Sequence, residues 1–235
     1  MFTYLCGAGK TISFSDTIKN QGGSDVGSST SKFYLSTNRT LEATVIYLGQ
    51  RTVPALTAGT SNTVSTSLTV PAGTATRAYY LIAKTDGDNS VSETNEANNI
   101  TTGTLVTIGP DIYSLTMSAP NTAKLGESIT VSDTTTNNGG GDAKISSKTY
   151  FYLSANKTWE TTDIYLGQRS IPALAAGVNN TDSIVLTIPT GIVAGNYYLM
   201  VKVDGDNNVY ETKEGNNINY KSITIDILGT SVLGR

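Results

Sequence analysis

Two short acidic segments are the residues of this chain best suited to chemistry. Each begins with Asp-Gly-Asp-Asn and ends with Glu-Thr-x-Glu-x-Asn-Asn, at the same spacing both times. Calcium prefers several hard oxygen ligands from carboxylates, amides and backbone carbonyls, so both segments are candidate calcium sites. The candidate ligands are Asp86, Asp88, Asn89, Glu93, Glu96, Asn98 and Asn99 in the first segment and Asp204, Asp206, Asn207, Glu211, Glu214, Asn216 and Asn217 in the second.

The same segments have a second, purely structural interpretation. Asp-Gly-Asp-Asn is typical of a tight turn, because glycine accepts a positive φ angle and Asx side chains hydrogen-bond to nearby backbone groups. The paired asparagines can satisfy backbone groups where the chain re-enters a sheet. The segments lack the fixed spacing of an EF-hand loop. The interpretation as a calcium-binding loop and the interpretation as a capped turn therefore both remain open.

Enzymatic chemistry lacks its usual residues. The chain has no histidine and a single cysteine, Cys6, so histidine-dependent nucleophilic sites are excluded and zinc lacks its usual ligands. Glu93 and Glu96 could serve as a glycosidase carboxylate pair. However, this pair recurs in both segments and no aromatic cleft accompanies it. We predict that the protein is not an enzyme and that calcium is its only candidate cofactor.

The two acidic segments belong to the duplication of a whole domain. Residues 33–99 return as residues 151–217 at a constant offset of 118, and 40 of these 67 positions are identical. Such a period is far longer than that of a solenoid or a propeller blade. Two domains of ordinary size also suit a chain of 235 residues. We predict domains at residues 1–109 and 110–235.

Short apolar segments in the second copy predict seven β-strands. Turn residues separate them about every ten residues, and no segment has the period of an amphipathic helix. The predicted strands cover residues 111–117, 128–132, 150–154, 164–169, 183–188, 197–203 and 222–227. This count and spacing are typical of an immunoglobulin-like sandwich. The predicted fold class is all-β, with two tandem immunoglobulin-like sandwiches of about seven antiparallel strands each.

Six motifs of the first copy have counterparts in the second. They are Asn20–Asp25, Phe33–Ser36, Tyr47–Gly49, Val53–Gly59, Tyr79–Leu81 and Glu93–Asn99. Together they resemble the CARDB family, a cell-adhesion-related domain of bacteria and archaea, over nearly the whole chain. The resemblance implies an immunoglobulin-like fold, an extracellular or cell-surface location and a non-enzymatic adhesive or spacer role. The chain departs from the shared pattern at Val45, which stands where the second copy has Asp163.

The two copies differ most at their beginnings. Gly126 aligns with Gly9, and the predicted strand 111–117 precedes Gly126, whereas only Met1 to Ala8 precede Gly9. The first domain is therefore expected to lack most of its first strand. Such a gap leaves an open sheet edge, which soluble proteins normally protect.

The tail Leu228–Arg235 falls where the first strand of a third repeat would begin. We hypothesise that the tail of one subunit completes the first domain of the next by strand donation. A head-to-tail contact of this kind does not close, so it would build a filament. Two alternatives are open: the chain is a fragment of a longer array, or Met1 to Cys6 form a poor first strand.

These observations predict an extracellular structural or adhesive module, a calcium-stabilised filament subunit that self-associates or binds other surface proteins or glycans. A net charge of −3 without a basic cluster predicts no nucleic-acid partner, and no apolar run is long enough to span a membrane. The alternative is a carbohydrate-binding module or a spacer pair of a larger secreted protein. Carbohydrate binding needs exposed aromatic residues, but Trp159, the single tryptophan, has Leu41 as its counterpart.

Overall fold

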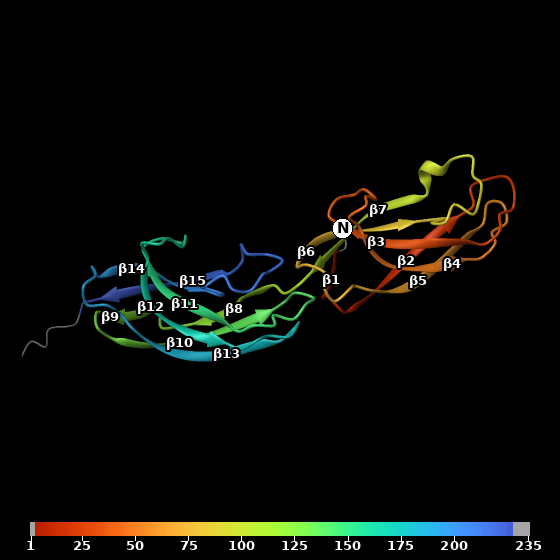
Figure 1. The fold of residues 1–235 in the computed structure, drawn as a ribbon. Coiled ribbons are helices and arrows are strands. Elements are labelled where there is room, and N and C mark those ends of the chain that lie inside the picture. The colour runs from red at the N-terminus through yellow and green to blue at the C-terminus, as the bar shows by residue number, and fades with distance from the viewer. Residues whose placement is uncertain (1–2, 228–235) are drawn as a thin grey trace, which may run out of the picture. The chain divides into compact units, whose positions relative to one another are not determined.

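The computed structural model describes residues 3–227, and its chain divides into two compact units, Met1–Gly109 and Pro110–Arg235 (Figure 1). Both units are built from β-strands. The only helix among the described residues is a single 3-10 turn, Glu96–Asn98, in the first acidic segment. The predicted all-β class is confirmed. No helix of the described chain is long and apolar enough to cross a membrane.

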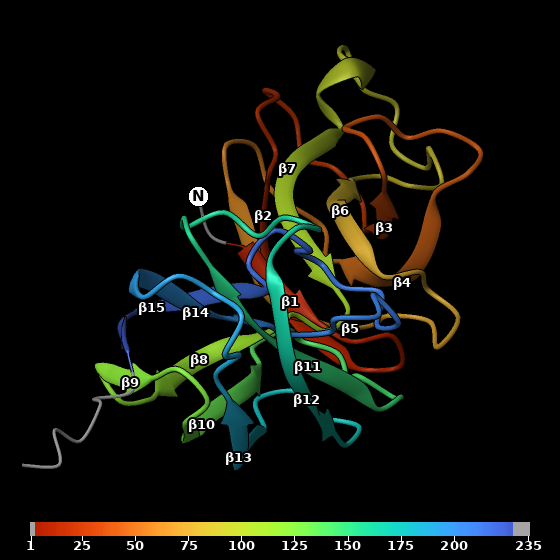
Figure 2. The ribbon, with the colours of Figure 1, turned by 90° about the vertical axis from the view of Figure 1, so that its left-hand side faces the viewer.

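The second unit is a sandwich of a five-stranded and a three-stranded sheet. Its strands are β8 (Ile112–Ser118), β9 (Thr122–Lys124), β10 (Ser128–Asn137), β11 (Ser147–Ser154), β12 (Ile164–Ile171), β13 (Asn179–Thr187), β14 (Gly195–Lys202) and β15 (Ile218–Asp226). One sheet has the order β12-β11-β14-β15-β9 and the other β13-β10-β8. Figure 2 shows these strands after a turn of 90° from the view of Figure 1. The strand β9 was not predicted. It forms because the chain changes sheets after Pro120 and pairs with β15 in parallel, which buries Ala123.

The first unit repeats this plan with one strand fewer. Its strands are β1 (Thr3–Cys6), β2 (Thr11–Lys19), β3 (Ser29–Ser36), β4 (Ile46–Val53), β5 (Ser61–Thr69), β6 (Arg77–Lys84) and β7 (Ile100–Ile108). The large sheet has the order β1-β7-β6-β3-β4, whereas the second sheet contains only β2 and β5. Residues 3–6 thus do form a strand, but it pairs in parallel with β7, in the position of β9. No described strand of this unit takes the position of β8.

The cores follow from the alternation of side chains along the strands. In the second unit, one continuous cluster runs from Ile112 through Phe151 and Leu199 to Ile225. In the first unit, the buried side chains form two separate clusters. The larger surrounds Phe33 and Leu81, and the smaller consists of Ile18, Val53 and Leu56.

A buried ion pair joins the two sheets of each unit. In the second unit, Arg169 Nη2 lies 2.8 Å from Asp133 Oδ2, and its Nε bonds the other carboxylate oxygen. In the first unit, Arg51 binds Asp16 in the same bidentate way, at 2.8 and 3.0 Å. Fork-to-fork geometry of this kind is the strong form of an arginine–carboxylate contact. The pair therefore sets how β2 faces β4, and how β10 faces β12.

Candidate functional site

The acidic segments are the loops that join β6 to β7 and β14 to β15. Both loops start with a residue in the left-handed region: φ is 45° at Asp86 and 48° at Asp204. The glycine that follows lies against the neighbouring strand. A Cβ on Gly87 would come within 2.7 Å of the Lys32 side chain, and one on Gly205 within 2.4 Å of the Tyr150 ring. This close contact with the neighbouring strand therefore explains why glycine follows the aspartate in both copies.

The first aspartate of each loop is buried and is bonded to its own backbone. Asp86 Oδ1 accepts from the Ser90 N–H at 2.9 Å, and Oδ2 accepts from the Val91 N–H at 3.0 Å. Asp204 receives the same two bonds from Asn208 and Val209. Burial by itself would raise the pKa of Asp86, but the donors at Val91 and Ser90 outweigh it and lower that pKa. These carboxylates act as turn caps.

The second aspartate of each loop ties the loop tip to the adjacent strand. Lys32 of β3 pairs with Asp88 and lowers its pKa. In the second unit, the Tyr150 hydroxyl donates to Asp206, and Lys148 Nζ lies 3.2 Å from the other oxygen. Both contacts lower the pKa of Asp206, and the same hydrogen bond raises the pKa of Tyr150 to about 12.

The second glutamate of each loop also holds the backbone. Glu96 Oε1 accepts from the Glu93 N–H at 3.1 Å, and Glu214 Oε1 accepts from the Glu211 N–H at 3.0 Å. Glu96 Oε2 also accepts from Asn99 Nδ2 at 3.1 Å. The capped-turn interpretation thus describes these residues in both copies.

The remaining predicted ligands are spread over the loops. Asn89 and Asn207 lie at the tips with positive φ angles, and Asn98 is exposed at the end of the 3-10 turn. Asn217 is buried and donates to Glu211, while Asn216 donates to Asp111. The described residues contain no group of three acidic, histidine or cysteine side chains arranged to hold one metal ion. Calcium binding stays a prediction.

The two copies differ in the surroundings of the first glutamate of each loop, Glu93 and Glu211. Glu211 is 9% exposed; its Oε2 accepts from the Ile112 N–H at 2.5 Å and its Oε1 from Asn217 Nδ2 at 3.0 Å. Burial raises the pKa of Glu211 to about 8, against the effect of these donors. The pKa of Glu93 is also raised, first by burial and then by Glu96 and Asp86. In the described structure Glu93 has no strand like β8 beside it to supply a backbone N–H.

Sequence reasoning missed the chain segment that enters β8 beside the second loop. The Pro110 carbonyl accepts from the Thr212 N–H at 2.9 Å and from its hydroxyl at 3.1 Å. Asp111 Oδ1 accepts from Asn216 Nδ2 at 2.8 Å, and Lys213 Nζ lies 3.4 Å from Oδ2. The acidic loop of the second unit is therefore a clamp for an incoming strand. The sequence did not reveal this contact, because pairing across about one hundred residues leaves no local signal.

An aromatic face lies on the outside of the large sheet of the second unit. Tyr152 packs edge-on against Tyr165 and Trp159, with ring centroids 5.6 and 6.0 Å apart. Lys202 Nζ lies 4.0 Å from the Trp159 ring centroid. Tyr165 is half exposed. The first unit places Leu41 where Trp159 stands, so its face carries fewer rings.

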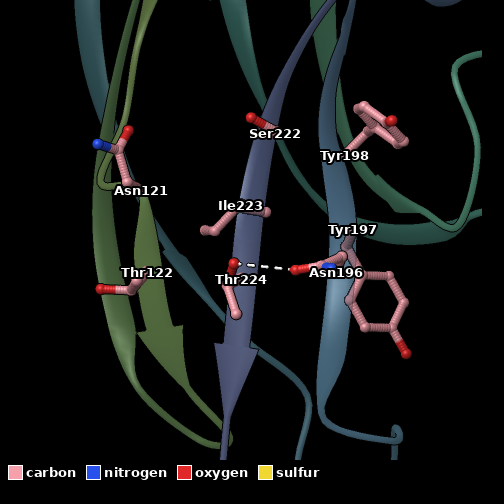
Figure 3. Close-up of a pocket in the computed structure, with 8 residues that line it drawn as sticks. All are labelled: Asn121, Thr122, Asn196, Tyr197, Tyr198, Ser222, Ile223 and Thr224. Atoms are coloured by element: carbon pink, nitrogen blue, oxygen red, sulfur yellow. Dashed lines mark hydrogen bonds between the residues drawn. The ribbon is translucent and has the colours of Figure 1, made fainter.

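A shallow depression covers β9, β14 and β15 near their ends (Figure 3). It is lined by Asn121, Thr122, Asn196, Tyr197, Tyr198, Ser222, Ile223 and Thr224. The Thr224 hydroxyl donates to Asn196 Oδ1 at 3.1 Å, and no charged side chain is among the lining residues (Figure 3). The lining therefore offers no charged ligand for a metal, and its titratable groups are the hydroxyls of Tyr197 and Tyr198.

Comparison with known proteins supplies the family. A crystal structure of the CARDB domain of a Pyrococcus furiosus protein, in complex with di-metal ions, is 17% identical with a TM-score of 0.40; the match covers 52% of this chain and 96% of that domain. A β-glucosidase from Listeria innocua in complex with laminaribiose is 15% identical with a TM-score of 0.36, over 50% of this chain and 16% of the enzyme. No curated protein matches the chain.

The family model named CARDB matches residues 6–103 and again residues 109–221. Each match contains one acidic loop and one pair of sheets, so the recurring motifs and the two folded units coincide. CARDB is a non-catalytic, adhesion-related family. The protein therefore belongs to the CARDB family, with two tandem copies of the domain.

Proposed function

We propose that this protein is an extracellular structural or adhesive module that assembles by accepting a β-strand from another copy at the free edge of β2. The observation that carries the proposal is the difference between β2 and β10. In the second unit, β10 lies between β13 and β8, whereas in the first unit β2 has β5 as its only described partner. The adhesion-related, non-catalytic family supports a role in assembly.

The free edge has the properties of an acceptor. Pairing with β5 runs from Thr11 to Lys19 on one side of β2, so its outward backbone groups have no described strand to bond. Such an edge is a template for another strand unless charge, proline or a bulge blocks it. Asp16 points inward to Arg51 and no proline interrupts β2, so only Lys19 at its end is a protecting charge.

The proposed donor is the tail Leu228–Arg235, which lies outside the described residues. It follows β15, and β15 corresponds to β7 of the first unit, which leads directly into β8. A strand donated from the end of one copy to the start of the next makes a head-to-tail contact that does not close. Filaments are the assembly expected from such contacts.

Electron microscopy of the chain at rising concentration tests the proposal. The full chain should form regular filaments, and a chain ending at Ile227 should stay as single particles. A matched control replaces residues 228–235 by a glycine-serine segment of the same length and should also stay single. Equal polymerisation of all three proteins would exclude strand donation by the tail.

A specific observation favours a second candidate function, carbohydrate binding by the second unit. Trp159, Tyr152 and Tyr165 lie together on an outer sheet face, and aromatic rings can stack against sugars. However, the rings pack edge-on against one another, and Lys202 covers one side of Trp159. Affinity electrophoresis in soluble polysaccharides tests this candidate. Retardation that the Trp159→Ala substitution removes would support it, and unchanged mobility in every polysaccharide would count against it.

A further inference from the structure

The beginning of β8 is held by side chains and backbone groups that recur in the first unit. In the second unit, Thr212 binds the Pro110 carbonyl, Asn216 binds the Asp111 carboxylate and Glu211 binds the Ile112 N–H. Asn137 at the end of β10 adds a bond from the Asp111 N–H to its Oδ1 at 3.1 Å. Counting Lys213, four residues thus contact the acid–aliphatic dipeptide Asp111-Ile112, and Thr212 as a fifth binds the preceding Pro110.

Four of these five groups have the same residue type in the first unit. Thr94 corresponds to Thr212, Glu93 to Glu211, Asn98 to Asn216 and Asn20 to Asn137, and only Lys213 differs, as Asn95. The first unit therefore carries the recognition groups for the start of a strand that its described residues do not contain.

The core of the first unit points to the same missing strand. Ile112 is 1% exposed and belongs to the single core cluster of the second unit. In the first unit no described residue takes the place of Ile112, and Ile18, Val53 and Leu56 form a cluster apart from the main core. An aliphatic side chain brought in at the position of Ile112 would bury its apolar surface against this smaller cluster and so stabilise the bound strand.

We propose that the first unit contains a preformed site that recognises an Asp-Ile dipeptide at the start of an incoming strand. Asp226-Ile227 of a second copy, which directly precede its donated tail Leu228–Arg235, supply this dipeptide. This inference rests on the strand-donation function proposed above and names the residues that the first unit recognises in the donated strand. The Asp226 carboxylate binds Asn98, the Ile227 N–H binds Glu93, and the Ile227 side chain enters beside Ile18.

The sequence around the end of β15 fits this assignment. Residues 226–232 read Asp-Ile-Leu-Gly-Thr-Ser-Val, and residues 111–117 read Asp-Ile-Tyr-Ser-Leu-Thr-Met. The dipeptide recurs unchanged, a small residue stands at the buried position of Ser114, and an apolar residue stands at that of Met117. Ile227 is 69% exposed, although it is a large aliphatic residue. Donation requires the terminal pair of Asp226 with Lys124 to separate and the 3.0 Å bond from the Leu125 N–H to the Asp226 carbonyl to break.

Peptide binding to the full chain, kept below the concentration at which it assembles, tests the site. The probe is a fluorescent peptide with the sequence of residues 226–235, and a second peptide with the sequence of residues 110–119 represents the strand that fills the equivalent site. Both should bind saturably. Exchanging Asp226 for Ala or Ile227 for Ser in the first peptide should each weaken binding about tenfold or more, because a charged hydrogen bond or a buried side chain is lost.

Substitutions in the first unit separate recognition from non-specific edge pairing. Glu93→Ala should weaken binding about tenfold, whereas Glu93→Gln keeps an acceptor for the N–H and should retain most of the affinity. Asn98→Ala should remove the preference for Asp over Ala in the peptide. Asn208→Ala, an exposed loop substitution in the second unit, is the control and should change nothing. Thermal unfolding of each variant shows whether the first unit is still folded.

The outcomes distinguish this inference from the function on which it rests. Tail-dependent filaments without binding of either peptide would overturn the acceptor site while leaving polymerisation intact. Binding of the 110–119 peptide alone would overturn Asp226-Ile227 as the donor. Binding that ignores both the peptide exchanges and Glu93→Ala would show unselective edge pairing and overturn the recognition proposed. Absence of both filaments and binding would reject the proposed function together with the site.

Discussion

The two units share their loops, their ion pairs and the order of their corresponding strands, yet among the described residues only the second contains the strand that its acidic loop holds. In the second unit, Ile112 closes one continuous core and its N–H reaches Glu211. In the first unit, the core is divided and Glu93 lacks this donor. The comparison shows that the Glu-x-x-Glu-x-Asn-Asn motif of the second unit has a structural task, which is to fasten the start of β8.

Breaking the buried ion pair should have the largest effect and should differ between the units. Arg169→Ala leaves the fully buried Asp133 without its partner, so we expect a loss of about 3–5 kcal/mol in unfolding free energy. Arg51→Ala should cost less, because the side chain of Asp16 is 10% exposed in the unit with the open edge. Denaturant unfolding followed by circular dichroism measures both. Equal losses in the two units would contradict the difference in burial.

Removing the Ile112 side chain, which holds β8 in the core, should make the second unit resemble the first. Ile112→Ala empties a site in the continuous core, and the unfolding free energy of the second unit should fall by about 2–4 kcal/mol. Tryptophan fluorescence isolates this unit, because Trp159 is the single tryptophan of the chain. Ile218→Ala, at a 40% exposed position, is the control and should cost far less. An unchanged transition for Ile112→Ala would show that β8 contributes little to the core.

The pH dependence of the second unit should reveal the buried glutamate. The pKa of Glu211 is about 8 in the folded unit, above its ordinary value of 4.5, so the folded state binds the proton more tightly. Its contribution to stability is complete below about pH 4.5 and is lost as pH rises through about 8, by at most about 1.4 kcal/mol per pH unit. Glu211→Gln should flatten this dependence of the tryptophan-detected transition. A transition of the unsubstituted chain that is independent of pH in this range would contradict the raised pKa.

Calcium should have the smallest effect of the four. Asp86 and Glu96 are already bonded to backbone N–H groups, so a cation must bind through the exposed loop tips. We expect calcium at millimolar concentration to raise the unfolding free energy of either unit by less than about 1 kcal/mol. Calorimetric titration, repeated with Asp88→Asn and Asp206→Asn, measures this binding. A stabilisation of several kcal/mol would show that the acidic loops are calcium sites rather than strand clamps.

Much of this molecule could be predicted because its signals are local or repeated. The constant offset of 118 between residues 33–99 and 151–217 revealed the duplication. Alternation of apolar and polar residues along segments such as 183–188 predicted strands with one face buried in the core. The sequence Asp-Gly-Asp-Asn correctly indicated a turn, since the φ angles of Asp86 and Asn89 and the contact of Gly87 depend on neighbours within the turn and one strand.

The candidate site was harder to predict, because its contacts join residues far apart in the chain. In the sequence, Glu211 is a candidate cation ligand together with Glu214 and Asp204. Only the fold places the Ile112 N–H beside Glu211 and shows that the carboxylate accepts a hydrogen bond from it. The pairing of Arg169 with Asp133 likewise spans two sheets. Residue types alone could not distinguish oxygen ligands for a metal from acceptors for a backbone.

The sequence by itself thus determined the duplication, the all-β class and the capped turns, which arise from periodicity and short-range bonding. The tertiary structure decided which sheet each first strand joins, which carboxylates are buried and where an edge is left without a partner. These features depend on packing between the two sheets of each sandwich. There, contacts form between residues that are far apart in the sequence, so the local sequence pattern does not determine them. The free edge of β2 and the unmatched Glu93 are visible only at that level.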